Sequence, residues 1–240
     1  MNRIYLDFEV NGEIPKHAIL VGDRARIDLF KEAADDSEVF FEKREFVLAK
    51  MKYHNRNILI ISTGMGAPST AIVIEELANL GVQKILRAGT MLVFDEENLG
   101  KIIIPIGAMR GDGLTINYVE QSYPAVPDTS FLKVIFSLQN ENIIFGIIKS
   151  SDSFYTDFSS GNLIDVDFLK YKQSFLKRIG ILGMDMETST VLILSRLLGL
   201  KSGVLCASTI SSDKRLDPNN RYKLEKKLVE LSLKVVKLWR

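Results

Sequence analysis

The segment Ile60–Thr90, IISTGMGAPSTAIVIEELANLGVQKILRAGT, decides the fold class of this chain. It opens with an apolar run that stops at the tight turn Gly64-Met65-Gly66, and an apolar helix pattern follows from Pro68 to about Leu80. A second short strand then ends in Arg87-Ala88-Gly89-Thr90. Backbone amides, a guanidinium and a hydroxyl therefore meet at the ends of neighbouring strands, where ligands bind in open α/β sheets. This arrangement predicts a site for an anion, most often phosphate.

The rest of the chain continues this alternation of strands and helices. Apolar runs predict strands at 17–21, 46–51, 57–62, 83–87, 101–109, 114–119, 142–149 and 202–208. Helical patterns follow Gly22-Asp23 up to about residue 33 and cover 68–80, 128–139, 164–177, 188–198 and 220–238, with Asp128 as an N-cap. We expect an α/β fold with a central mixed, twisted sheet covered by helices on both sides. No linker or repeat is evident, so we expect a single domain over residues 1–240.

Composition excludes several classes of protein. Formal net charge is +1 from 31 basic and 30 acidic residues, which gives no electrostatic footprint for nucleic acid. With Cys206 as the single cysteine, an intramolecular disulfide is ruled out. The residues around Cys206 predict that it packs inside a buried strand. With His17 and His54 as the only histidines, a histidine metal site or a Ser-His-Asp triad is disfavoured. The N-terminus lacks the apolar stretch of a signal peptide and no run is long enough to span a membrane, so we expect a cytoplasmic protein.

Several short motifs have both a structural and a functional interpretation. Gly22-Asp23-Arg24-Ala25-Arg26 opens a helix and can bind an anion, or can be a helix start with surface arginines. Arg87 at a strand end needs a partner, which is a bound anion or a nearby carboxylate. Asp185 and Glu187 precede a helix and can serve as caps or as ligands. The turn GMGAPS lacks the third glycine of a dinucleotide fingerprint, and no acidic ribose ligand follows at the usual distance. The sequence therefore disfavours the binding of NAD.

Together these segments resemble the nucleoside phosphorylases of the uridine and hexameric purine type, over nearly the whole chain. The match includes STG-x-G-x-PS with EEL and LR-x-GT, the GD-x-x-R turn at Gly22, SSD-x-FY from Ser150, and MDMET, which resembles the family's EMES segment. The resemblance is greatest to uridine phosphorylases. It implies phosphate-binding roles for five residues: Gly22, Arg26, Arg44, Arg87 and Thr90. Arg44 lies in KREF, a sequence that is otherwise typical of solvated surface, and in the family it reaches into the neighbouring subunit's site.

The same resemblance implies how a sugar and a cation are bound. Glu187 would accept hydrogen bonds from ribose hydroxyls and Met186 would pack on the sugar. Tyr5 is the nearest match to a histidine that family members donate to a neighbour's ribose. Glu45, the Met65 carbonyl and Ser69 fall where some of these enzymes hold a monovalent cation between subunits. Arg87 and Glu187 are the candidate catalytic residues.

The base pocket is where this chain departs from the family. Met91-Leu92 replaces a small residue and a glycine, and Phe154 matches the residue that stacks on the base. Phe158 and Ser160 stand where uridine enzymes carry a glutamine and an arginine that read uracil. Purine enzymes use an aspartate that falls in the stretch 208–213. Ungapped alignment puts Ile210 there, so Asp213 could serve if the loop shifts.

The resemblance therefore implies phosphorolysis of a nucleoside, with a uridine-like substrate favoured and inorganic phosphate as co-substrate rather than any cofactor. A purine or methylthioadenosine phosphorylase is the first alternative, and a catalytically weak homologue that retains the phosphate site and acts as a binding subunit is the second. Nucleoside and phosphate are the expected partners, without nucleic acid or membrane. Because Arg44 and Tyr5 would complete a neighbour's site, we expect a dimer as the minimal unit, assembled further into a hexamer.

Overall fold

The computed structural model describes residues 4–8, 12–159 and 162–240. Nine strands form one mixed sheet in the order β2-β3-β4-β1-β5-β8-β7-β6-β9. Their bounds are β1 His17–Val21, β2 Asp36–Lys43, β3 Phe46–Tyr53, β4 Arg56–Ser62, β5 Lys84–Val93, β6 Ile102–Gly111, β7 Ile143–Ser151, β8 Ile181–Asp185 and β9 Lys201–Ser211. The helices are α1 Arg26–Ala33, α2 Ala67–Asn79, α3 Thr129–Phe136, α4 Phe154–Asp157, α5 Val166–Arg178, α6 Thr188–Leu197 and α7 Pro218–Leu238. Short 3₁₀ turns, η1 and η2, cover Glu96–Asn98 and Thr115–Asn117.

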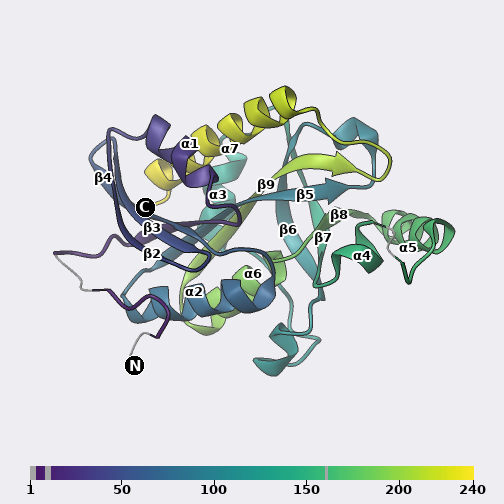
Figure 1. The fold of residues 1–240 in the computed structure, drawn as a ribbon, viewed down its shortest axis with the longest axis horizontal. Helices are drawn as coiled ribbons and strands as arrows, with labels where there is room; N and C mark the ends of the chain where they lie inside the picture. Colours follow the sequence, from purple (N-terminus) through teal and green to yellow (C-terminus); the bar gives the residue numbers. More distant parts are fainter. Residues whose placement is uncertain (1–3, 9–11, 160–161) are drawn as a thin grey trace.

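Helices cover both faces of the sheet, as the sequence pattern predicts (Figure 1). Helices α1, α3 and α7 pack on one face, where Phe30, Phe131 and Leu228 are fully buried. Helices α2 and α6 pack on the other face, where Ile74 and Val191 are fully buried. The three-layer α/β prediction is confirmed.

The second half of the sheet closes on itself. β5 pairs in parallel with both β1 and β9, and it also pairs antiparallel with β8. Since β8 pairs with β7, β7 with β6 and β6 with β9, five strands form a ring in which β5 is shared with the open part of the sheet. β5 therefore extends beyond the short strand expected at 83–87.

Local contacts explain where the sequence pattern misleads. The strand predicted at 114–119 is wrong, because the Asp112 carboxylate accepts from the Thr115 N–H and starts the turn η2 instead. Strand β2 was not predicted, because it is a charged, mostly exposed strand that forms through pairing with β3. Strand β8 and the short helix α4 were not predicted either, because each is only four or five residues long.

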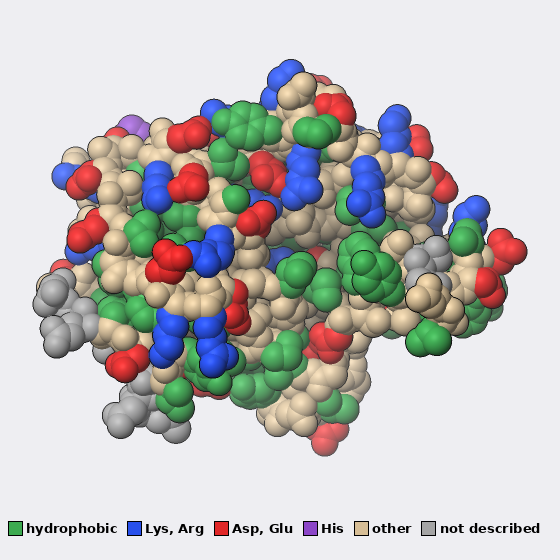
Figure 2. Space-filling model, viewed as in Figure 1, with side chains coloured by type: hydrophobic (Ala, Val, Ile, Leu, Met, Phe, Trp, Pro, Cys, Tyr) green, Lys and Arg blue, Asp and Glu red, His purple; other side chains and the backbone are tan. Residues whose placement is uncertain are grey.

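The surface of the described residues matches the balanced charge of the chain. On the face drawn in Figure 2, lysine and arginine side chains are interspersed with aspartate and glutamate. Within the described part of the chain, no helix has both the length and the apolar character that a membrane crossing needs.

His17 at the start of β1 predicts how stability depends on pH. Its Nε2 lies 2.9 Å from the Trp239 carbonyl oxygen, and burial lowers the pKa of this histidine to about 4. The unfolded chain binds the proton near the ordinary pKa of about 6.5, so the folded state loses stability as pH falls from about 6.5 towards 4. Urea unfolding of His17→Gln across that range should show a shallower pH dependence than the wild type. The exposed His54 gives the control His54→Asn, which should keep the wild-type slope.

Candidate active site

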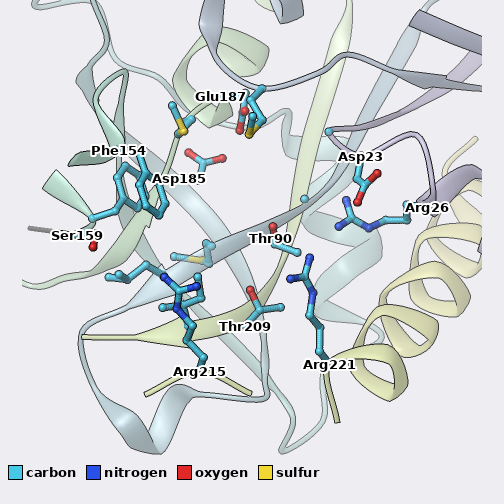
Figure 3. Close-up of a pocket in the computed structure, with 18 of the residues that line it drawn as sticks. Asp23, Arg26, Thr90, Phe154, Ser159, Asp185, Glu187, Thr209, Arg215 and Arg221 are labelled. Carbon is cyan, nitrogen blue, oxygen red and sulfur yellow. The ribbon is translucent and has the colours of Figure 1, made fainter. Parts of the chain in front are cut away.

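A cavity of about 870 Å³ opens where β1, β4, β5, β8 and β9 end (Figure 3). Gly22 and Gly64 follow β1 and β4, and Arg87 to Leu92 on β5 form one wall of the cavity. Residues 209–215 after the middle of β9 and Phe154 on α4 close the other sides. Most of the predicted site residues lie around this one cavity, as expected for ligands at strand ends.

The Arg87 side chain is fixed at this site by burial and by ion pairs. It is buried, its Nε lies 3.4 Å from Asp185 Oδ2, and its Nη2 donates to Glu187. The guanidinium lies directly over Gly89, where a Cβ would come within 2.7 Å of Nη2. Its Nη1 is buried without a hydrogen-bond partner among the described residues. Two carboxylates therefore pair with Arg87, as one of its two interpretations predicts. Anion binding by the remaining Nη1 group stays a prediction.

Glu187 and Asp185 share this guanidinium but serve different local roles. Asp185 caps α6, since it accepts from the Thr188 N–H at 3.1 Å and from the Thr188 hydroxyl at 2.7 Å. Glu187 makes no capping bond and instead accepts from the Gly66 N–H at 2.7 Å. Burial raises the pKa of Glu187, and the Asp185 charge adds to this while Arg87 opposes it. Met186 lies between them and lines the cavity, where the resemblance places the sugar.

Arg26 lies at the start of α1, with its guanidinium also buried. Its Nη1 donates to the Ala88 carbonyl at 3.2 Å, its Nη2 lies 3.4 Å from Glu225 Oε1, and its Nε has no partner among the described atoms. Burial lowers the pKa of Arg26, and the Glu225 charge counteracts this. Gly22 and the half-buried Thr90 line the cavity near Arg26, so four of the five predicted phosphate-binding residues come together.

The fifth, Arg44, does not line this chain's cavity. It lies exposed in the β2–β3 turn with a φ of 59°, and its guanidinium lies 5.6 Å from the centre of the Tyr5 ring. Tyr5 is also outside the cavity, and its segment is held by the Glu76 carboxylate, which accepts the Tyr5 N–H at 2.9 Å. The two residues that the resemblance assigns to a neighbouring subunit therefore lie against each other, away from their own chain's site.

The candidate cation ligands lie near one another. Glu45 and Met65 line the cavity, and the Ser69 hydroxyl donates to the Met65 carbonyl at 3.2 Å. Histidine, cysteine, aspartate and glutamate form no cluster of three or more suited to a metal in the described ranges. A monovalent cation held by these oxygens stays a prediction.

The end of the cavity that the resemblance assigns to the base is largely apolar, and we refer to it as the base end. Met91 and Leu92 are each 3% exposed, and the rings of Phe154 and Phe158 stack with centroids 5.4 Å apart and planes 5° from parallel. All four line the cavity, as does the exposed Asp213. Ser160 lies outside the described residues.

Several polar lining residues were not found from the sequence, and three of them lie on or after β9. Arg221 in the first turn of α7 binds Glu225 Oε1 at 3.0 Å, so Glu225 bridges it to Arg26. Thr209 is the extra residue of β9 where its pairing with β5 shifts, and Arg215 follows in the next turn. All three lie outside the motifs, and the weak signal was the cluster of basic residues before and after Pro218.

The comparisons with known proteins define the class. Residues 16–237 match the Phosphorylase superfamily, and the chain therefore belongs to this family of nucleoside phosphorylases, which are pentosyltransferases. One similar protein is the guanosine phosphorylase of Halorubrum lacusprofundi, 33% identical over 199 residues, which are 81% of this chain and 78% of that protein. Another is the uridine phosphorylase of Haemophilus influenzae, 30% identical over 209 residues, which are 84% of this chain and 83% of the relative.

Solved structures of two nucleoside phosphorylases have a fold similar to that of this chain. The uridine phosphorylase from Vibrio fischeri ES114, complexed with 6-hydroxy-1-naphthoic acid, superposes with a TM-score of 0.83 at 29% identity, over 93% of this chain and 92% of that one. The purine nucleoside phosphorylase from Toxoplasma gondii, in complex with immucillin-H, superposes with a TM-score of 0.79 at 25% identity, over 93% and 90%. The resemblance to nucleoside phosphorylases is thus confirmed.

Proposed function

We propose that this protein catalyses phosphorolysis of a nucleoside whose base is an oxo-pyrimidine or oxo-purine, with uridine and guanosine as the leading candidates. The observation that carries the proposal is the buried Arg87, whose Nη1 has no hydrogen-bond partner within the described ranges and which lines the cavity with Thr90 and Arg26. A fixed guanidinium with free donors suits phosphate, which is the co-substrate of the family. The names of the two relatives supply the choice of bases.

In the proposed reaction, a phosphate oxygen bonds to C1′ of the sugar while the bond from C1′ to the base nitrogen breaks. The electron pair of that bond leaves with the base, and the proton of hydrogen phosphate ends on the base. Arg87 and Arg26 fix the phosphate below C1′, so that attack becomes intramolecular. Glu187 orients the sugar through its hydroxyls and places a negative charge near the developing oxocarbenium ion.

Turnover measurements on a panel of nucleosides test this proposal. The panel is uridine, thymidine, cytidine, inosine, guanosine, adenosine and methylthioadenosine, each with and without phosphate. Phosphate-dependent release of a base with formation of ribose 1-phosphate is the expected result. Saturable phosphate binding without turnover of any nucleoside would instead indicate a phosphate-binding homologue.

We also propose that the site is completed by a second copy of the chain, with a dimer as the unit of a larger assembly. Its support is the Arg44–Tyr5 pair, which lies outside the cavity of its own chain. Arg44→Ala and Arg87→Ala should each have low activity alone, because each lacks one arginine at every site.

Mixing the two variants checks the assembly directly. Reassociated together, they should regain activity, since a mixed dimer has one site with both arginines. Sedimentation should show a dimer, or an assembly built from dimers, in each case. A monomer with full activity, or no recovery in mixtures shown to exchange subunits, would contradict the proposal.

A further inference from the structure

Arg215 differs from the other arginines of this cavity, because its exposed side chain has no carboxylate partner among the described residues. Arg24, Arg26, Arg87 and Arg221 also line the cavity, and each forms an ion pair. No described residue forms a hydrogen bond or an ion pair with the Arg215 guanidinium, although it also lines the cavity. Its donors are therefore available to a ligand.

The backbone at Arg215 is well anchored. Ile210 and Arg215 form an antiparallel bridge, and on either side of it the Leu216 N–H donates to the Thr209 carbonyl at 3.0 Å and the Ser211 N–H to the Lys214 carbonyl at 2.7 Å. These bonds make a tight hairpin at the end of β9. In Figure 3, Arg215 reaches up from this hairpin across the cavity from Phe154 and Ser159. The guanidinium is thus placed at the apolar base end, apart from Arg26 and Arg221.

The chemistry of a guanidinium restricts what this end of the cavity can bind. It offers five N–H donors in a plane and no acceptor. A 6-oxopurine presents O6 and N7 as adjacent acceptors, which a guanidinium binds in bidentate fashion, and uracil presents carbonyl oxygens. Cytosine and adenine present an exocyclic amino group in place of one of these oxygens, so two donors would face each other.

Building on the proposed phosphorolysis, we propose that Arg215 binds the carbonyl edge of the leaving base and stabilises its negative charge. When the bond from C1′ to the base nitrogen breaks, the electron pair spreads onto the base oxygens. A guanidinium beside those oxygens interacts more strongly with the departing anion than with the neutral base. Arg215 thereby supplies a charge that Met91, Leu92 and the two phenyl rings cannot, and it favours oxo bases over amino bases.

Kinetics of Arg215→Met, with Arg178→Met as matched control, test this role. Arg178 is exposed at the end of α5 and does not line the cavity, so its replacement removes the same charge elsewhere. Arg215→Met should lower kcat/KM for uridine, inosine and guanosine by about 100-fold or more, the usual effect of losing one oxyanion donor. For cytidine and adenosine the loss should be much smaller, and Arg215→Lys should recover part of the oxo preference.

Leaving-group dependence separates stabilisation of the base anion from a structural role. The base of 5-fluorouridine is a more stable anion, so it needs less help, and its kcat should fall less in Arg215→Met than that of uridine. An equal loss for every nucleoside, or an unchanged ratio of oxo to amino substrates, would overturn the role of Arg215 while phosphorolysis stands. If the wild type cleaves no nucleoside, the proposed function fails and this inference fails with it.

Discussion

Replacing Arg87 with methionine is expected to lower kcat/KM for phosphate by about 30- to 1,000-fold, or about 2–4 kcal/mol. The reason is the loss of a buried guanidinium whose Nη1 has no hydrogen-bond partner among the residues the structure describes, and which we propose binds the anion. Steady-state kinetics with varied phosphate should show both a higher KM and a lower kcat. Phosphate should also raise the unfolding temperature of the wild type and leave that of the variant unchanged.

The same substitution has a structural cost that controls must separate. Asp185 and Glu187 would remain buried without their cation, which typically destabilises by about 3–5 kcal/mol. The double variant Arg87→Met with Glu187→Gln removes one of these charges, and Arg87→Lys keeps a cation without the planar fork. A folded Arg87→Lys protein with wild-type phosphate KM would refute a direct contact between the guanidinium and phosphate.

Substituting Gly183 with alanine is the second change expected to have a large effect. A Cβ at Gly183 would lie 2.1 Å from the Leu92 carbonyl oxygen and 2.8 Å from the Val93 Cα, so β8 must move away from β5. Overpacking of this kind costs about 1–3 kcal/mol, and more where backbone must shift. Because β8 leads directly to Asp185 and Glu187, a displacement of about 1 Å should also lower kcat by about 100-fold.

Gly107→Ala provides the matched control in the same sheet. Its added Cβ would meet only ordinary contacts, with 3.8 Å to the Ala125 carbonyl oxygen as the closest. Denaturant unfolding and turnover should place Gly107→Ala near the wild type and Gly183→Ala far below it. Similar values for the two variants would show that β8 tolerates the shift.

Sequence patterns predicted the parts of this molecule in which local signals and tertiary structure agree. Buried strands such as β1 and β4 are continuous apolar runs, and Gly22 and Arg26 stand at the junction of β1 and α1. Arg87 and Thr90 lie within β5, which is longer than predicted, yet they line the same cavity. Strand β8 has only five residues, and the glycines at 180 and 183 weaken the sequence pattern from which a strand would be predicted. It forms because neighbouring strands pair with it, which no local pattern encodes.

The cationic residues after β9 were missed for a related reason. Arg215 and Arg221 belong to no short motif, and the sequence around them is typical of solvent-exposed surface residues. The hairpin after β9 and the first turn of α7 bring them to a cavity formed mainly by residues far earlier in the chain. Tertiary structure alone distinguishes these arginines from the other basic residues nearby.

The irregularity in the pairing of β5 with β9 divides the cavity into two regions that can change separately. Up to the pair of Met91 with Ser208, the two strands pair in one register. Leu92 then pairs with Ile210, so Thr209 has no partner on β5 and the register changes by one residue. Arg87 and Thr90 precede this point, whereas Ile210 and Arg215 follow it. If the proposed site holds, we therefore expect substitutions after the shift to reshape the base end while the anion end keeps its geometry. Such a scaffold can acquire a new base preference without rebuilding its phosphate chemistry.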